Sequence, residues 1–350
     1  MTARDRPDDL GRIEYTPADG LRMGEASTPS SGASMPAAAE SSGETLPPDP
    51  AREPAAAPHE PETAARPTAG DTAEHRFPGI DARSFRDRRD AERMARVRLL
   101  KGLDFVYSRF LNLGVEGAMA QETAAQAVQI HAGQGVALWA LLDRAARVLD
   151  VRVPELYLGR YDSAMQTIGH ERPFIVTDVD YVELLDGDEV IFAFGRELGH
   201  ILLGHVTYKM LARSIGAIGD TVGTFTLNVG SMVTTGLEAP LRDWDQFSEF
   251  SADRAGLLAA GRLDVALSAL FKQAAGGQRF FDQMNLPAFV EQGRRALYAE
   301  RPAGTRLSAI ARSLQAGAPL LAARAAALSE WYAGGEFSAI LRGQYTRRGA

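Results

Sequence analysis

Apolar positions recur with a helical period over most of the chain beyond residue 84. Between residues 136 and 148 they form one stripe: Val136, Leu138, Leu141, Leu142, Ala145 and Val148. Spacings of three and four residues place such positions on one face of a helix. A charged stretch over 86–96, followed by apolar positions over 97–110, shows the same period. Both segments are therefore predicted to be helical.

Three short apolar runs interrupt this pattern and predict strands over 127–130, 155–158 and 174–177. The sequence Asp186-Gly187-Asp188 then supplies capping residues for a central helix predicted over 188–213. After Pro240 the pattern predicts five more helices, over 247–260, 263–274, 287–299, 307–314 and 318–332. Together these elements indicate an α+β fold that is mostly helical and contains a small sheet.

The first part of the chain has a different composition. Residues 24–73 consist mainly of Pro, Ala, Ser, Thr and Glu. Such a segment cannot bury enough apolar surface to offset the entropy lost on ordering. We therefore expect a disordered tail over residues 1–75 and a folded domain over residues 76–350.

Charge and composition narrow the classes of function. The formal net charge is −7, from 38 Lys and Arg against 45 Asp and Glu, whereas nucleic-acid-binding proteins usually have a basic surplus. The arginine-rich stretch 83–98 is interpreted as a solvated helix face rather than a site for an acidic partner. There is no cysteine, which excludes disulfides and thiolate ligands. We recognise neither a signal peptide nor a membrane-spanning run, so we expect a soluble, cytoplasmic protein.

The central helix contains the motif Arg196-Glu197-Leu198-Gly199-His200. In the HExxH pattern of zinc peptidases, two His ligands lie one helical turn apart and the Glu is the general base. Glu197 and His200 match this pattern, but Arg196 stands at the position of the first ligand. Taken alone, Glu197 can be a surface residue and His200 a buried core histidine, so the interpretation depends on a second motif.

That second motif is Ser248-Glu249-Phe250-Ser251-Ala252-Asp253. Zinc peptidases often take a third ligand from a second helix, where a nearby acid orients a histidine ligand. Glu249 and Asp253 lie four residues apart and share one helix face. Glu249 is therefore the candidate third ligand and Asp253 the candidate orienting residue. The alternative for Asp253 is a surface charge paired with Arg254 or Arg242.

With both motifs in this order, the chain resembles the HtpX and CAAX-prenyl-protease type of gluzincin metallopeptidases, in particular their soluble bacterial members. The resemblance extends over roughly residues 99–341 and includes two predicted strands and Pro319 with Arg324. It implies a zincin-like metallopeptidase domain that hydrolyses peptide bonds. By this resemblance His200 and Glu249 hold zinc, Glu197 is the base and Asp253 lies behind the ligands.

Three positions depart from the family pattern. Arg196 replaces the first His ligand, Ala318 stands where a His usually precedes Pro319, and Ser163-Ala164 stand for a common Asn-Ala pair. An arginine side chain stays protonated and has no lone pair for a metal. Two protein ligands then remain where a catalytic zinc normally has three.

Two hypotheses follow for the function. In the first, Arg196 occupies the position of zinc and neutralises Glu197 and Glu249. The protein is then a catalytically impaired pseudopeptidase that binds a peptide or protein in its cleft. In the second, zinc is bound by an altered ligand set that recruits His205 or Asp253, and the protein is an active endopeptidase.

Two further features bear on these hypotheses. His205 does not complete the longer HExxHxxGxxH pattern, because Leu203 and Val206 stand at its Gly and His positions. Residues 214–237 are rich in Gly and Thr. They are either a flap over the cleft or, as we expect, a packed helix–loop excursion. The sequence does not indicate the oligomeric state.

Overall fold

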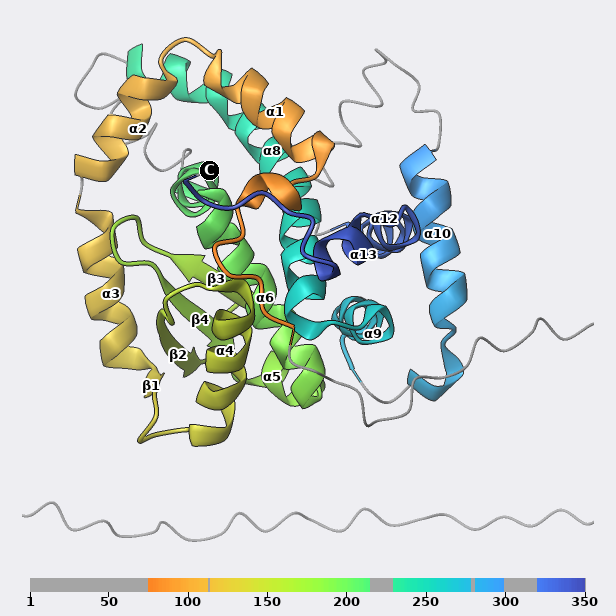
Figure 1. Cartoon of the computed structure of the whole chain (residues 1–350). Helices are drawn as coiled ribbons and strands as arrows, with labels where there is room; N and C mark the ends of the chain where they lie inside the picture. The colour runs from red at the N-terminus through yellow and green to blue at the C-terminus, as the bar shows by residue number, and fades with distance from the viewer. Residues whose placement is uncertain (1–74, 113, 215–228, 278–280, 299–319, 350) are drawn as a thin grey trace, which may run out of the picture. The chain divides into compact units, whose positions relative to one another are not determined.

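A four-stranded sheet and a majority of helices confirm the predicted α+β fold (Figure 1). The structure is a computed structural model that describes residues 75–349 except 113, 215–228, 278–280 and 299–319. The strands are β1 (Val128–Ile130), β2 (Glu155–Gly159), β3 (Met165–Ile168) and β4 (Phe174–Asp178), in the order β1–β2–β4–β3. β2 and β4 are parallel, and β1 and β3 run antiparallel to their neighbours. The predicted tail lies outside the described residues and stays a prediction.

Strand β3 was missed by the sequence analysis. Its four residues, Met-Gln-Thr-Ile, are too few and too mixed in polarity to show a clear strand pattern. Met165, Thr167 and Ile168 are nevertheless buried. β3 pairs with β4 at the edge of the sheet, where Thr167 lies opposite Ile175. The pairing with β4, and not the local sequence, makes this segment a strand.

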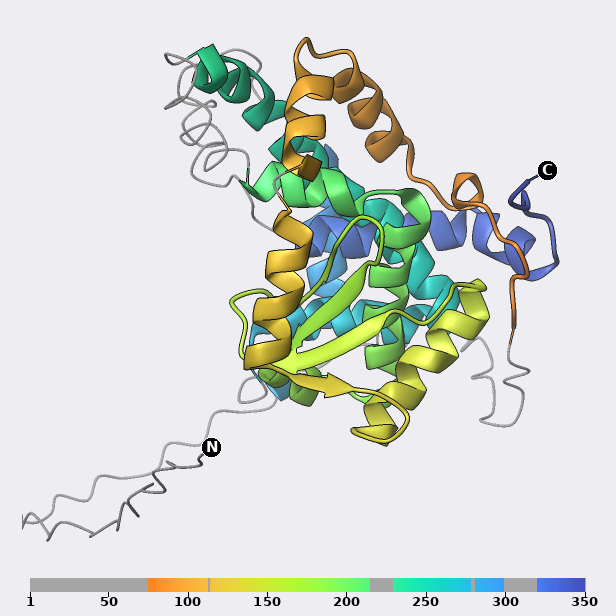
Figure 2. The ribbon, with the colours of Figure 1, turned by 90° about the vertical axis from the view of Figure 1, so that its left-hand side faces the viewer.

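Helices account for most of the rest: η1 (Ala82–Ser84), α1 (Arg88–Arg98), α2 (Leu103–Asn112), α3 (Val115–Gln126), α4 (Val136–Leu149), α5 (Val179–Leu184), α6 (Gly187–Leu203), α8 (Val229–Ala260), α9 (Leu263–Ala275), η2 (Phe281–Gln283), α10 (Leu286–Tyr298), α12 (Leu321–Ala333) and α13 (Glu336–Leu341). α3 contacts β2, α4 contacts β1 and α6 contacts β3, so helices cover the sheet (Figure 2). Among the described residues, no helix is long and apolar enough to cross a membrane.

The central helix α6 is shorter than predicted. Asp186 caps its first turn, and its side chain and that of Glu189 form a reciprocal capping box. The helix ends where Gly204 adopts a left-handed conformation with φ of 66°, which glycine accepts at little cost. Residues 206–214 then begin a new helical segment. The predicted single helix over 188–213 is therefore wrong, because Gly204 redirects the chain.

Helix α8 is longer than predicted and contains Pro240 in its interior. A proline removes one backbone hydrogen bond and usually kinks or ends a helix. Here the turns around it bury Leu237, Leu241 and Trp244 completely or nearly so, and this packing holds the helix together. The helix therefore starts at Val229 rather than near residue 247. Of the predicted excursion over 214–237, the part from residue 229 onward is helical, and residues 215–228 lie outside the described residues.

Helices α6 and α8 approach each other closely along a line of small residues. A Cβ atom on Gly195 would lie 2.4 Å from Cβ of Ala259, and one on Gly199 would lie 2.5 Å from Cβ of Ala255. Distances this short are not found between real side chains, so glycine is required at both positions. The close approach brings Arg196 of α6 next to the acidic face of α8.

Candidate metal-site remnant

The two predicted motifs meet in the interior of the domain. α6 supplies Arg196, Glu197 and His200, and α8 supplies Glu249 and Asp253. Arg196, Glu197 and His200 are 5%, 3% and 1% exposed, so these polar side chains are shielded from water. Buried charges of this kind are tolerated only when they are paired and hydrogen-bonded.

Arg196 binds both acids of α8. Its Nε donates to Oδ1 of Asp253 over 2.9 Å, and its Nη2 donates to Oε2 of Glu249. Burial alone would lower the pKa of Arg196, but Glu249 and Asp253 raise it above its usual value. The guanidinium therefore stays charged, and its hydrogen bonds go to Glu249 and Asp253, whereas its effect on Glu197 is through charge alone.

Asp253 lies deep in the interior, at 1% exposure, and not on the surface of α8. Arg324 of α12 donates to both of its oxygens, over 2.8 Å to Oδ2 and 2.6 Å to Oδ1. Nη1 of Arg324 also lies 3.6 Å from Oε2 of Glu249. Arg254 and Arg242, the surface partners considered from sequence, pair instead with Asp87 and Glu238. Ala318 and Pro319 lie outside the described residues.

A second cation, Lys209, was missed by the sequence analysis. Its Nζ lies 2.5 Å from Oε1 of Glu249 and 2.6 Å from Oδ1 of Asp245. Burial alone would raise the pKa of Glu249, but the charges of Lys209 and Arg196 hold it well below its usual range. The available signal was a single lysine in the otherwise uncharged stretch 206–212, where it needs a buried partner.

His200 and His205 are linked to Asp90 of α1. Nδ1 of His200 lies 3.2 Å from Nδ1 of His205, whose Nε2 lies 3.2 Å from Oδ2 of Asp90. Burial raises the pKa of Asp90, but hydrogen bonds from His205, Ser251 and Trp244 outweigh it, so Asp90 is ionised and accepts. Nε2 of His205 therefore donates to Asp90, its Nδ1 accepts, and Nδ1 of His200 is the donor.

This arrangement leaves Nε2 of His200 with a lone pair and no hydrogen bond. The atom lies 3.4 Å from Oε1 of Glu249. Burial and the charge of Lys209 both lower the pKa of His200 well below its usual value. The ring is therefore neutral, which is the form that a metal ligand requires.

Glu197 faces the edge of the sheet. Its Oε2 accepts a hydrogen bond of 2.8 Å from Oγ1 of Thr167 in β3. Burial raises the pKa of Glu197, and the effect of nearby Arg196 is too small to cancel this rise. A carboxyl group with a raised pKa beside a sheet edge has the environment of a general base, but it has no polarised water to act on without a metal.

The donor set does not fit a three-ligand zinc site. Arg196 has no lone pair, and both oxygens of Glu249 are engaged by cationic side chains. His205 and Asp253, the candidate substitutes, are engaged by Asp90 and by Arg196 and Arg324. Within the described part of the chain, no three His, Asp or Glu side chains are placed to hold a metal ion. Nε2 of His200 is left without a hydrogen-bond partner in the described part of the chain.

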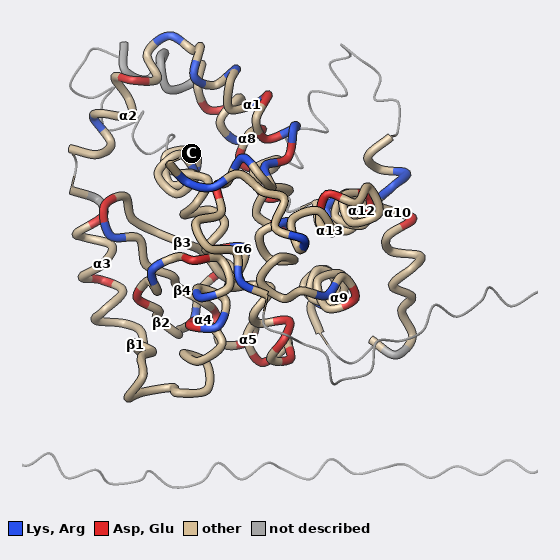
Figure 3. The backbone as a smooth tube through the Cα atoms, viewed as in Figure 1, with Lys and Arg blue, Asp and Glu red and all other residues tan. Residues whose placement is uncertain are grey.

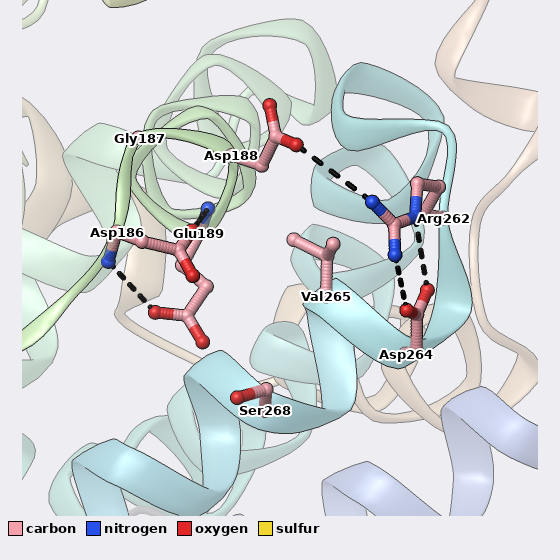
Figure 4. Close-up of a pocket in the computed structure, with 8 residues that line it drawn as sticks. All are labelled: Asp186, Gly187, Asp188, Glu189, Arg262, Asp264, Val265 and Ser268. Carbon is pink, nitrogen blue, oxygen red and sulfur yellow. Dashed lines mark hydrogen bonds and ion pairs between the residues drawn. The ribbon is translucent and has the colours of Figure 1, made fainter. Parts of the chain in front are cut away.

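Two surface hollows formed by the described residues lie away from this cluster. One, of about 510 Å³, lies where α6 and α9 begin and is lined by charged residues, among them Asp188, Arg262 and Asp264 (Figure 4). The other, of about 590 Å³, lies between α1, α8 and α10 and is lined by Phe247 and Phe250 among others. Neither is lined by Glu197 or His200.

Comparisons with known proteins agree with the two motifs. The sequence profile described as "Peptidase family M48" matches residues 167–332. The chain is also similar to the plastoglobule-localized metallopeptidase 48, chloroplastic, of Arabidopsis thaliana. The two are 30% identical over 271 residues, which cover 76% of this chain and 77% of the relative. No solved structure matches the chain significantly.

Proposed function

The chain belongs to peptidase family M48, and from this premise we propose that it is a pseudopeptidase of the HtpX and CAAX-prenyl-protease type that works without zinc. Its former metal site is an internal ion-pair network that ties α6, α8 and α12 together. The retained function is binding of a peptide or protein rather than its hydrolysis. A cytoplasmic location and the division of the chain at residue 75 remain predictions.

The observation that supports this proposal most directly is the state of Glu249. In a working site one of its oxygens would bind the metal. Here Arg196 engages Oε2 and Lys209 engages Oε1. Both cations belong to the chain itself, so the charge of the buried Glu249 carboxylate is compensated without a metal. The orientation of Arg196 toward Glu249 is the one that charge replacement predicts.

The proposed binding site lies beside β3. Thr167 of this strand touches Glu197, so the former catalytic base borders the sheet edge. Among the described strands, β3 pairs with β4 alone, which leaves its outer edge open to an extended segment. A peptide held there would lie next to Glu197 but would meet no activated water.

A second candidate is an active zinc endopeptidase, and one observation favours it. Nε2 of His200 is buried, neutral and without a hydrogen bond, as a vacant ligand atom would be. For zinc to bind there, Lys209 or Arg196 must release Glu249. His200 and Glu249 would then be two ligands of a rebuilt set.

Metal analysis of the full-length protein separates the two candidates. After dialysis against trace zinc, we expect much less than one zinc per chain in the wild type. The double variant R196H/K209M supplies the missing imidazole and frees Glu249, so it should bind about one zinc per chain. R196H alone should bind less, because Lys209 still engages Glu249. Adding His200→Ala to the double variant is the control that should remove the metal.

The outcomes are distinct. About one zinc in the wild type, lost on His200→Ala, would establish the second candidate and overturn the first. A folded R196H/K209M protein that binds no zinc would show that this is not a converted zinc site. Peptides that the wild type binds should stay intact with it, whereas the zinc-loaded double variant should cleave them unless Glu197→Gln is added.

A further inference from the structure

The corner between α1 and α2 exposes large apolar side chains to solvent. Leu99, in the turn, is 83% exposed, Phe105 is 60% exposed and Leu111 is 36% exposed. Side chains this exposed project from the surface and do not line a hollow. Scattered single apolar residues are normal on protein surfaces, but three within one stretch of residues 99–111 form a local feature that needs an explanation.

Packing on the inner side holds this corner in place. Val97, Leu103, Val106 and Phe110 are each 1–3% exposed and belong to one core cluster with Trp244 of α8. The turn between the helices is closed by a hydrogen bond from Leu100 N to Val97 O. The outward direction of the exposed residues is therefore set by buried neighbours on the same two helices.

Basic residues surround the exposed apolar ones. Arg96, Arg98, Lys101 and Arg109 are all exposed, and no ion pair or hydrogen bond engages their side chains within the described part of the chain. Asp104 is the single acidic residue in the sequence 96–111. Arg109 lies four residues after Phe105 on the same side of α2, and Lys101 lies in the turn that precedes this helix. Figure 3 shows basic positions along this corner of the chain.

We infer that this corner binds the surface of an anionic lipid bilayer. Leu99 and Phe105 enter the boundary between headgroups and acyl chains, as apolar residues of interfacial helices do. The long aliphatic stems of Lys101 and Arg109 lie along the apolar region while their charges meet lipid headgroups. The whole chain carries a net charge of −7, so a cationic corner is not a consequence of composition and would orient the protein on the membrane.

A lipid surface fits these features better than an acidic protein. A protein partner would need a pocket of matching shape for each projecting apolar side chain. A bilayer accepts projecting apolar side chains without a preformed pocket and neutralises several cations at once. The inference does not depend on whether zinc binds at the interior site.

Sedimentation of the full-length protein with vesicles tests the inference. We expect binding to vesicles of equal parts phosphatidylcholine and phosphatidylglycerol, and little binding to phosphatidylcholine alone. K101Q/R109Q removes two cations, each contributing about fivefold to the affinity, and should therefore weaken vesicle binding about 25-fold. High salt should weaken the binding of the wild type in the same way. L99S/F105S should weaken binding by roughly tenfold or more.

Matched variants elsewhere serve as controls. R295Q/R342Q removes two other exposed arginines, and V136S removes a valine that is 58% exposed at the start of α4. Both should bind as the wild type does, and all variants should keep the wild-type thermal midpoint because the changed side chains are exposed. Equal losses in test and control variants, or no binding to anionic vesicles at low salt, would overturn the inference. Retention on immobilised polyglutamate without vesicle binding would assign the corner to an acidic protein instead.

Discussion

Single buried side chains balance the charges of the two acidic residues of α8, Glu249 and Asp253. Arg196 and Arg324 offset Asp253, and Arg196 and Lys209 offset Glu249. Removing one cation leaves buried carboxylates with less opposing charge, which costs more than the pair itself contributes. At this scale Arg196 is both a side chain without a lone pair for a metal and the buried partner of two carboxylates.

We therefore expect Arg196→Met to lower the free energy of unfolding by about 3–5 kcal/mol. The matched control is Arg262→Met, because Arg262 forms an ion pair with Asp264 at a site where both are exposed. Such a pair contributes at most about 1 kcal/mol. Urea unfolding of the three proteins measures the difference. Equal, small effects of both substitutions would contradict the structural role of Arg196.

Helix pairs decide where these side chains meet. α6 and α8 come close enough for Arg196 to bind Glu249 because Gly195 and Gly199 have no Cβ atoms in the contact. The motif positions on each helix follow from the sequence, but their distance from one another depends on this contact. The length of α8 was not predicted for a similar reason, since Leu237 before Pro240 and Leu241 after it are both buried in one core cluster.

Gly195→Ala tests the contact between these helices. The added Cβ would lie 2.4 Å from Cβ of Ala259 and 2.9 Å from Cα of Gly256. Overpacking of this kind should destabilise the protein by about 1–3 kcal/mol. Gly236→Ala in the partner helix α8 is the control, since nothing lies within 4 Å of its added Cβ. It should stabilise by about 0.5–1 kcal/mol, because glycine is a poor helix former. Thermal unfolding measures both variants. Midpoints that shift in the same direction would contradict the close contact between α6 and α8 at Gly195.

The domain as a whole is joined by contacts between residues far apart in sequence. The N of Phe77 donates to Val148 O, and the N of Asp81 donates to Thr346 O. Asp87, at the start of α1, caps that helix and binds Nη2 of Arg254 in α8 over 2.7 Å. These contacts attach the first described segment to the remainder of the domain.

Asp87 should make stability depend on pH. Burial raises its pKa, but the hydrogen bonds from Arg89 and the charge of Arg254 outweigh this and lower it overall. The unfolded carboxyl has a pKa of about 3.9. Because the folded value is lower, the stabilisation is complete above the unfolded pKa and is lost as pH falls through the folded pKa.

Asp87→Asn should therefore cost about 1–3 kcal/mol at neutral pH. The gap between the wild type and the variant should stay constant down to about pH 5 and narrow below about pH 4. Chemical unfolding at several pH values measures the gap. A gap that widens in acid would show that the folded carboxyl is not held in its ionised form.

The local sequence determined the positions of several helices and the identity of the motif residues. The period of apolar residues placed α4 and α9 within a few residues, because helical spacing is a property of the local chain. The two motifs identified Arg196, Glu197, His200, Glu249 and Asp253 from residue type and spacing alone. That Arg196 cannot ligate a metal also follows without a structure, since a guanidinium has no lone pair at any physiological pH.

Tertiary structure decided what surrounds those residues. Lys209 lies nine residues after His200, and Asp90 lies on the separate helix α1. No local sequence pattern relates either residue to the motifs. β3 is a strand because it pairs with β4. α8 continues past Pro240 because the residues around that proline pack in the core. Each of these features depends on atoms brought together from distant parts of the chain. Their energies come from burial and charge pairing, which spacing along a sequence does not report.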